Sequence, residues 1–341
     1  MKSNKIGILT IPLNNNFGGI LQSYALNKTL RDNGYETVVL LPTCHSVKEY
    51  IKKIADYISP ASCFIRKNID VLYIDYRNIY SEINKHCIDT VVVGSDQVWR
   101  PEFMNVKLSF CVGFDFTKIK VLSYAASFGF DQWIYNSEET AMAKKAIGSF
   151  AGISVREDSA VELCKDFLSA RAQHVLDPTM LVEKAQYISM CKQDSNKYIF
   201  CYLLGYTNNS NLEVVNSAQK QLGIKVKHIY LTRNKFLKRF RFNESIQKWL
   251  SLIYNSQLVI TDSFHGTVFS IIFNRPFYVL QNKKGGNSRI LSLLKIFGLE
   301  NRMITSWTNI GNEYINWEHV NSTLKEWKKD SITFLNKTLY D

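Results

Sequence analysis

The chain has 341 residues, 46% of them apolar, which is enough for one large domain or two with a sizeable core. This composition excludes a largely disordered protein, and no apolar run reaches the ~18 residues that a membrane-spanning helix needs. The net charge of +12 favours anionic partners such as phosphate esters, acidic glycans, nucleic acid or an anionic membrane surface, without choosing among them.

The start of the chain lacks the apolar core and cleavage site of a signal peptide, so a cytoplasmic location is predicted. The seven cysteines are an odd number without a C-x-x-C pair, which indicates reduced thiols rather than disulfides or a zinc site. Because no H-E-x-x-H, D-x-D or Cys/His cluster occurs, we expect no metal and no cofactor.

Short apolar runs alternate with polar loops and helical periods along the first half of the chain. Strands are expected at 5–11, 36–41, 87–94, 121–127, 151–156 and 172–177, and a helix at 20–34. Strands that are apolar on both faces and alternate with helices indicate a parallel, doubly wound sheet.

The same alternation returns near residue 197, after a connection at 182–196. Strands are expected at 197–205, 225–232, 257–261 and 276–280, and helices at 209–223, 246–256, 267–274 and 288–299. The sequence therefore predicts an α/β protein with two doubly wound, Rossmann-like domains, residues 1–190 and 197–319, facing a cleft. A last helix, 320–341, is expected to pack back on the first domain.

In such sheets ligands bind beyond the carboxyl ends of the strands, so the loops there are the candidate sites. The loop after the first strand holds Asn14, Asn15, Asn16 and Gly18 before a helix, where backbone N–H groups attract anions. A simple capped turn explains these residues equally well. The dinucleotide fingerprint G-x-G-x-x-G is absent.

The strand at 87–94 leads into Ser95, Asp96, Gln97 and Trp99. Asp96 is predicted to be a general base or to hold a sugar hydroxyl, with helix capping as the alternative. Ser95 and Gln97 are expected to bind the same ligand, and Trp99 to offer it a stacking surface.

Arg156 directly follows the run GISV, 152–155, at the end of the strand expected at 151–156. Its planar guanidinium suits a carboxylate or a phosphate, so we predict an anion clamp; an ion pair with Glu157 or Asp158 on a rim is the alternative.

The stretch TDSFHG, 261–266, joins an apolar strand to an apolar helix. His265 is expected just before the helix, where it can exchange a proton near neutral pH. Asp262 or Ser263 would orient the ring, and Gly266 would leave space for the ligand.

Two basic segments complete the set of candidates. The loop before the helix at 288–299 carries Asn287, Ser288 and Arg289 with Lys283 and Lys284, which favours a second anion cradle or a plain surface loop. Residues 225–241 are basic with interleaved aromatics but show no RRM, KH or helix-turn-helix pattern. We expect no nucleic-acid partner there, and contact with lipid phosphates or an anionic acceptor instead.

Taken together, seven pieces in order resemble the polysaccharide pyruvyl transferase family from about residue 6 to 300. They are NNNFGGILQSYAL, VVVGSDQVW, SYAASFG, SVREDS, VLDPTML, LVITDSFHGTVFSIIFNRPF and NSRILSLLKIFGL. The resemblance implies a fold like that of the GT-B glycosyltransferases. It also implies transfer of the pyruvate unit from phosphoenolpyruvate to a sugar as a ketal, on lipid-linked or polymeric cell-surface glycans.

The resemblance also implies roles for single residues. Arg156 matches the family's phosphoenolpyruvate-binding arginine, and His265 matches its essential histidine. Many members have an arginine two residues before that histidine, where this chain has Ser263. The missing charge is expected from Arg289 or Arg275. His265 is then expected to supply a proton and Asp96 to accept one.

Two other classes remain open from the sequence alone. A GT-B glycosyltransferase that uses nucleotide sugars would share the fold, and a non-catalytic binder of anionic glycans would use the segment 225–241.

Overall fold

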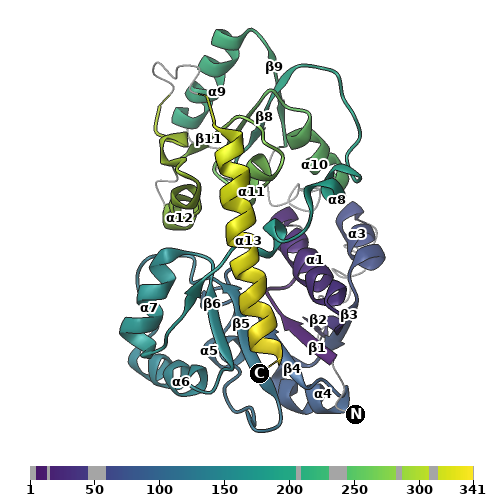
Figure 1. Cartoon of the computed structure of the whole chain (residues 1–341), viewed down its shortest axis with the longest axis vertical. Coiled ribbons are helices and arrows are strands. Elements are labelled where there is room, and N and C mark those ends of the chain that lie inside the picture. The colour runs from purple at the N-terminus through teal and green to yellow at the C-terminus, as the bar shows by residue number, and fades with distance from the viewer. Residues whose placement is uncertain are drawn as a thin grey trace. The chain divides into compact units, whose positions relative to one another are not determined.

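The computed structural model describes residues 5–13, 16–44, 59–204, 209–229, 244–281, 286–306 and 314–340. The chain divides into two compact units, whose elements are labelled in Figure 1. The first unit comprises Met1–Val182 with Glu326–Asp341, and the second unit comprises Glu183–Lys325.

The first unit is built on a parallel sheet of seven strands in the order β3-β2-β1-β4-β5-β6-β7. The strands are β1 (Lys5–Leu9), β2 (Glu36–Pro42), β3 (Val71–Ile74), β4 (Thr90–Val93), β5 (Lys120–Ala126), β6 (Gly152–Val155) and β7 (Gln173–His174). The strand order reverses between β1 and β4, which is where doubly wound sheets bind their ligands.

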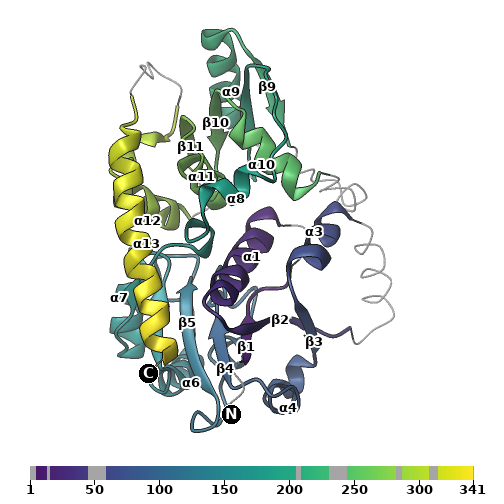
Figure 2. The same cartoon turned by 45° about the vertical axis from the view of Figure 1, so that its right-hand side comes forward.

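Helices connect these strands along the chain (Figure 2). They are α1 (Phe17–Asp32), α3 (Pro60–Asn68), α4 (Ile79–Lys85), α5 (Val106–Ser109), α6 (Ser137–Ile147) and α7 (Asp158–Leu168). α6 begins with a capping box in which Asn136 and Glu139 satisfy each other's backbone N–H groups. The sequence analysis did not predict α3, β3, α4, α5 or α6, which lie between the strands that it did predict.

The second unit has a parallel sheet of five strands in the order β12-β11-β10-β8-β9. Its strands are β8 (Tyr198–Tyr202), β9 (Lys225–His228), β10 (Leu258–Thr261), β11 (Phe277–Leu280) and β12 (Met303–Ile304). Its helices are α8 (Lys184–Ile188), α9 (Asn209–Leu222), α10 (Ile246–Tyr254), α11 (Phe264–Ile272) and α12 (Asn287–Phe297). The strand order reverses here between β8 and β10.

The prediction of an α/β protein with parallel sheets is confirmed. The central strands β4 (TVVV) and β10 (LVIT) are mostly apolar and rich in β-branched residues, as a sheet covered on both faces requires. Each unit has its own core, around Leu9, Val91 and Trp99 in the first and around Ile199 and Ile260 in the second.

The last helix, α13 (Trp317–Tyr340), packs its C-terminal part on the first unit. The Leu176 N–H donates to Ser331 Oγ at 3.0 Å, and Lys120 Nζ donates to the Leu339 carbonyl at 3.0 Å. Gly152, on β6, leaves room for the Thr338 side chain. None of the helices that the structure describes is both long and apolar enough to cross a membrane.

Candidate functional site

Arg156 lies at the carboxyl edge of the first sheet, directly after β6, with its side chain only 1% exposed. Its Nη1 donates to Asp177 Oδ2 at 3.1 Å, and its Nη2 donates to Asp96 Oδ1 at 3.2 Å. These three side chains come from the ends of β6, β4 and β7, and we call them the buried ion triad. The triad contains the predicted Arg156 and Asp96.

Asp96 reaches Arg156 because the chain turns sharply after β4. Gly94 has φ +126°, and a Cβ there would overlap the Tyr124 carbonyl oxygen, so only glycine fits. Asp96 itself is left-handed, with φ +72°, a conformation that aspartate and asparagine tolerate better than most residues. The Asp96 carboxylate therefore binds the guanidinium and does not cap a helix.

Asp177 is a member of the triad that the sequence analysis missed. Its Oδ1 accepts the Thr179 N–H at 3.0 Å and the Thr179 hydroxyl at 2.6 Å, and its Oδ2 accepts from Ser95 Oγ at 3.4 Å. The signal was available, because Asp177 stands at the end of a predicted strand, as Arg156 does, and Asp96 lies just beyond the end of another. What was lacking was any indication that these strand ends meet.

The charges of the triad favour an ionised arginine. Burial by itself would lower the pKa of Arg156, but the carboxylates of Asp96 and Asp177 outweigh it and raise this pKa. The triad then carries one positive and two negative charges, and Glu157 lies close enough to act on Arg156 as well. An additional anion can bind Arg156 favourably only if one of the two carboxylates moves away from it.

Ser95 ties the triad to the point where the strand order reverses. Its N–H donates to Gln22 Oε1 at 3.2 Å, and its carbonyl accepts from Thr10 Oγ1 at 3.1 Å. Gln22 Nε2 in turn donates to Thr10 Oγ1 at 3.0 Å. The loops after β1 and β4 are thus joined by buried hydrogen bonds, which hold the Asp96 backbone in register.

Helix α1 begins a few residues after Thr10 in the chain and carries Gln22, and both residues belong to this network. Asn16 is exposed at the N-cap and makes no capping hydrogen bond, and Gly18 is buried in the first turn. No acidic side chain lies in the first turn of α1. No side chain of that turn therefore balances the partial positive charge at the helix N-terminus. Asn14 and Asn15 lie outside the described residues.

The predicted stacking role of Trp99 is wrong. Its ring is fully buried, stacked on Phe110 at 5.2 Å between centroids and packed against Phe128, and its Nε1 donates to the Ser109 carbonyl. Although Trp99 lies close to the end of β4, its side chain is part of the hydrophobic core of the first unit. Gln97 Oε1 accepts from Arg100 Nη1 at 3.0 Å.

His174, on β7, links Arg156 to the C-terminal helix and gives the first unit a pH dependence. Its Nε2 lies 3.0 Å from the Arg156 carbonyl oxygen, and its ring packs edge-on against Trp327. Burial lowers the pKa of His174, against smaller raising effects of that hydrogen bond and of Asp158. Folding therefore opposes protonation of this side chain.

We expect acid to destabilise the wild-type protein more than the variant His174→Gln. The unfolded histidine has its ordinary pKa of about 6.5. Below that pH the unfolded state binds more protons than the folded state, so stability falls with falling pH. Melting temperatures between pH 7.5 and 5 should fall less steeply for the variant, and equal slopes would refute this role of His174.

In the second unit the end of β10 and the start of α11 hold the predicted histidine. α11 begins at Phe264, so His265 is the second residue of the helix and not the residue before it; it is 7% exposed. Asp262 Oδ1 accepts the Leu204 N–H at 2.6 Å, which joins the ends of β10 and β8 where the strand order reverses. His265 therefore lies at the edge where a doubly wound sheet binds ligands.

Ser263 and Gly266 have packing roles beside His265. Ser263 is the N-cap of α11, and its hydroxyl accepts the Gly266 N–H at 3.3 Å. A Cβ at Gly266 would overlap Thr261 Oγ1, which itself donates to the Tyr202 carbonyl at 2.7 Å. The prediction that Gly266 leaves space for a ligand is wrong, because the Thr261 side chain fills that space.

Gly266→Ala is accordingly expected to cost about 1–3 kcal/mol of stability, as overpacking in a close-packed core does. Thermal unfolding measures the loss. Gly148→Ala is the matched control, because an added Cβ there has only ordinary contacts at 3.6 Å and the backbone is right-handed. A Gly266→Ala protein as stable as this control would contradict the packing role.

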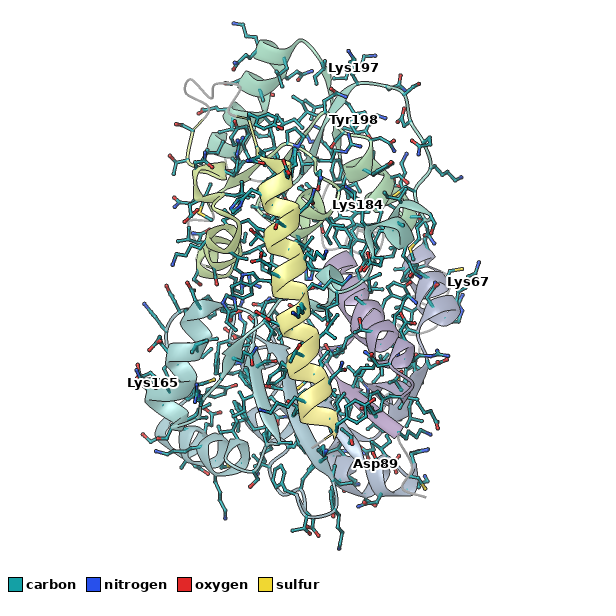
Figure 3. All side chains as sticks on the ribbon, in the orientation of Figure 1. Lys67, Asp89, Lys165, Lys184, Lys197 and Tyr198 are labelled. Atoms are coloured by element: carbon teal, nitrogen blue, oxygen red, sulfur yellow. The ribbon has the colours of Figure 1, made fainter. Side chains whose placement is uncertain are left out.

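The start of α12 contains the predicted anion-binding residues Asn287, Ser288 and Arg289, after a left-handed Gly286. Arg275, the other candidate for the missing charge, lies with its guanidinium 5.1 Å from the Tyr254 ring centroid. Burial lowers the pKa of Lys184, and the positive charge of Arg275 lowers it further. Lys184 is labelled in Figure 3. Lys283 and Lys284 lie outside the described residues, as does the segment 225–241 beyond Ile229.

A pocket of about 300 Å³ opens in the second unit between α10 and the residues that precede β8. Lys192, Asp194, Tyr198 and Lys248 are among its lining residues, and Tyr198 is labelled in Figure 3. It contains none of the predicted site residues and lies at the amino end of β8, so we do not assign the chemistry to it. Within the described part of the chain, no group of three His, Cys, Asp or Glu side chains is arranged to hold a metal ion.

Solved structures similar to this chain include UDP-GlcNAc 2-epimerases and a plant protein complexed with UDP-L-rhamnose. UDP-GlcNAc 2-epimerase from Methanocaldococcus jannaschii has a TM-score of 0.53 and 14% identity, over 94% of this chain and 92% of that chain. The Neisseria meningitidis epimerase bound to UDP-GlcNAc has a TM-score of 0.52 and 13% identity, over 98% and 99%. UGT89C1 from Arabidopsis thaliana, complexed with UDP-L-rhamnose, has a TM-score of 0.55 and 9% identity, over 98% of each chain.

At such low identities these likenesses show the fold alone, and they confirm the predicted GT-B-like fold. No curated protein matches the chain by sequence. The sequence does match the polysaccharide pyruvyl transferase family over residues 16–284, which include the triad and His265. The resemblance noted in the sequence is thus confirmed, and the chain belongs to the polysaccharide pyruvyl transferase family.

Proposed function

We propose that this protein transfers the pyruvate unit of phosphoenolpyruvate to a sugar of a capsular, exopolysaccharide or lipid-linked glycan, forming a ketal. The family match supports the class of reaction. The observation that carries the donor is Arg156, a fully charged guanidinium at the carboxyl edge of the first sheet, with its two terminal nitrogens turned to carboxylates. Phosphoenolpyruvate offers both a carboxylate and a phosphate to such a group.

The reaction requires one proton to be given and two to be taken. Protonation of the methylene carbon of the donor leaves an oxocarbenium-like centre at C2, and a sugar hydroxyl attacks that centre. Phosphate then leaves, and a second hydroxyl closes the ketal. Of the two hydroxyl protons released, one replaces the proton given to the methyl group, and the other leaves with phosphate.

We assign the proton donor to His265 and the first proton acceptor to Asp96. His265 lies in the first turn of α11, and histidine is the side chain that most often gives or takes a proton in catalysis. Asp96 has the carboxylate chemistry of a base for a sugar hydroxyl. Arg289 or Arg275 would supply the second unit with the positive charge that Ser263 lacks.

The acceptor follows from the family and the charge of the chain. We propose a lipid-linked oligosaccharide reached at the cytoplasmic face of the membrane, with the basic segment 225–241 facing lipid phosphates. Lys225 and Lys227 are the only residues of this segment's basic set that lie in the described chain, and Lys227 is paired with Asp194 at 2.6 Å. The membrane contact therefore depends on the residues beyond β9.

The experiment supplies purified protein with phosphoenolpyruvate and a panel of galactose- and mannose-type acceptors, free and lipid-linked. We expect phosphate release that depends on acceptor, and a mass gain of about 70 daltons on the acceptor, which is pyruvate less water. Absence of both signals across the panel would reject the proposal.

A parallel thermal-shift experiment separates this activity from its nearest rival. Phosphoenolpyruvate should raise the melting temperature, since a ligand that binds only the folded state stabilises it. If UDP- or GDP-sugars raise the melting temperature and phosphoenolpyruvate does not, the protein is a nucleotide-sugar glycosyltransferase instead.

A further inference from the structure

We propose that the Asp96 carboxylate is an internal stand-in for the substrate anion: it occupies the anion subsite of Arg156 until the substrate displaces it, while Asp177 keeps the guanidinium in place. This inference rests on the proposed function for the identity of the anion. It concerns only side chains of the first unit.

The two carboxylates of the triad are held very differently. Asp177 accepts hydrogen bonds from Thr179, from Ser95 and from Arg156, so both of its oxygens are engaged. Within the described chain, the Asp96 carboxylate binds Arg156 alone, through one oxygen at 3.2 Å. Removing Asp177 from Arg156 would break a buried network, whereas moving Asp96 breaks one charged hydrogen bond.

Accessibility points to the same carboxylate. The side chains of Asp177 and Arg156 are 0% and 1% exposed, and that of Asp96 is 4% exposed. Asp96 follows Gly94 in the loop after β4, at the edge of the sheet where ligands bind. A ligand that approaches Arg156 from this loop therefore meets Asp96 first.

The charge balance makes displacement necessary. Arg156 is already shared by two carboxylates, so a third anion at the same nitrogens would add repulsion to a buried group. If the donor replaces Asp96 at Nη2, the number of anions hydrogen-bonded to Nη1 and Nη2 does not increase. The displaced carboxylate is then released next to the donor, where it is free to accept the proton of the attacking sugar hydroxyl. Donor binding and base activation become one event.

The test compares ligand affinity in the wild type, Asp96→Asn and Asp177→Asn by titration calorimetry, with phosphoenolpyruvate and inorganic phosphate as separate probes at fixed ionic strength. Asparagine tolerates the left-handed backbone at 96 and removes the competing charge. We expect Asp96→Asn to bind phosphoenolpyruvate about tenfold more tightly than wild type while its turnover falls. Asp177→Asn is expected to bind about tenfold more weakly, because Arg156 loses its anchor.

Asp131→Asn is the matched control, since it makes the same change of charge on an exposed residue and should leave affinity unchanged. A merely structural Asp96 would give Asp96→Asn unchanged or weaker binding together with a lower melting temperature, and that result overturns the inference. If Asp96→Asn does not fold, Asp96→Ser serves in its place, with the same expectations.

The two probes separate this inference from the proposed function. If phosphate binds Asp96→Asn more tightly than wild type and phosphoenolpyruvate binds neither, Arg156 is an anion subsite shielded by Asp96 and the proposed donor is wrong. If neither probe binds more tightly to Asp96→Asn than to wild type, Asp96 shields no anion subsite and the inference fails.

Discussion

His265→Ala is expected to reduce turnover of phosphoenolpyruvate by about 10²–10⁴-fold, the usual contribution of a positioned acid or base. The histidine is the second residue of α11 and is almost fully buried at the edge where β10 ends. In the proposed reaction, protonation of the donor carbon creates the electrophile, so tighter binding would not offset the loss of this step. Steady-state phosphate release with a responsive acceptor measures the effect.

The fold should survive this substitution, because the Ser263 cap and the Asp262 contact with Leu204 do not involve the ring. Circular dichroism and the affinity for phosphoenolpyruvate check this, and both should stay close to wild type. His319→Ala, an exposed histidine on α13, should have full activity. A His265→Ala enzyme with wild-type turnover would remove this residue from the chemistry.

Arg156→Met is expected to have the largest effect on stability, a loss of about 3–5 kcal/mol. The substitution leaves the carboxylates of Asp96 and Asp177 buried without their counter-charge, and an uncompensated buried charge costs this much. Urea unfolding measures the loss, and calorimetry should show no remaining affinity for phosphoenolpyruvate.

Two control variants separate charge from packing. Arg156→Lys keeps the charge, but a single ammonium group lacks the planar fork that reaches two carboxylates, so intermediate stability is expected. The triple change Arg156→Met, Asp96→Asn and Asp177→Asn removes all three charges together and should recover much of the lost stability. If the single and the triple changes are equally destabilising, the ion triad is not what stabilises this edge of the sheet.

Much of the fold could be predicted from the order of residues alone. Mostly apolar runs rich in β-branched residues, such as 90–93 and 258–261, alternate with helical periods and indicate parallel strands covered on both faces. The same pattern placed Asp96, Arg156 and His265 at strand ends, where the structure has them. The helices α3 to α6 and the strand β3 were not predicted, although they lie between strands that were.

The contacts among these strand ends could not be predicted in this way. That Arg156 faces Asp96 and Asp177 follows from the strand order, which brings β4, β6 and β7 to one edge although 81 residues separate Asp96 from Asp177. The inward turn that buries Trp99, and the Thr261 side chain that fills the space at Gly266, are likewise products of packing. Residues at the ends of strands could be recognised in the sequence, since periodicity is a local property. Contacts among them emerge on folding, because side-chain contact depends on strand order and on close packing between segments far apart in the chain.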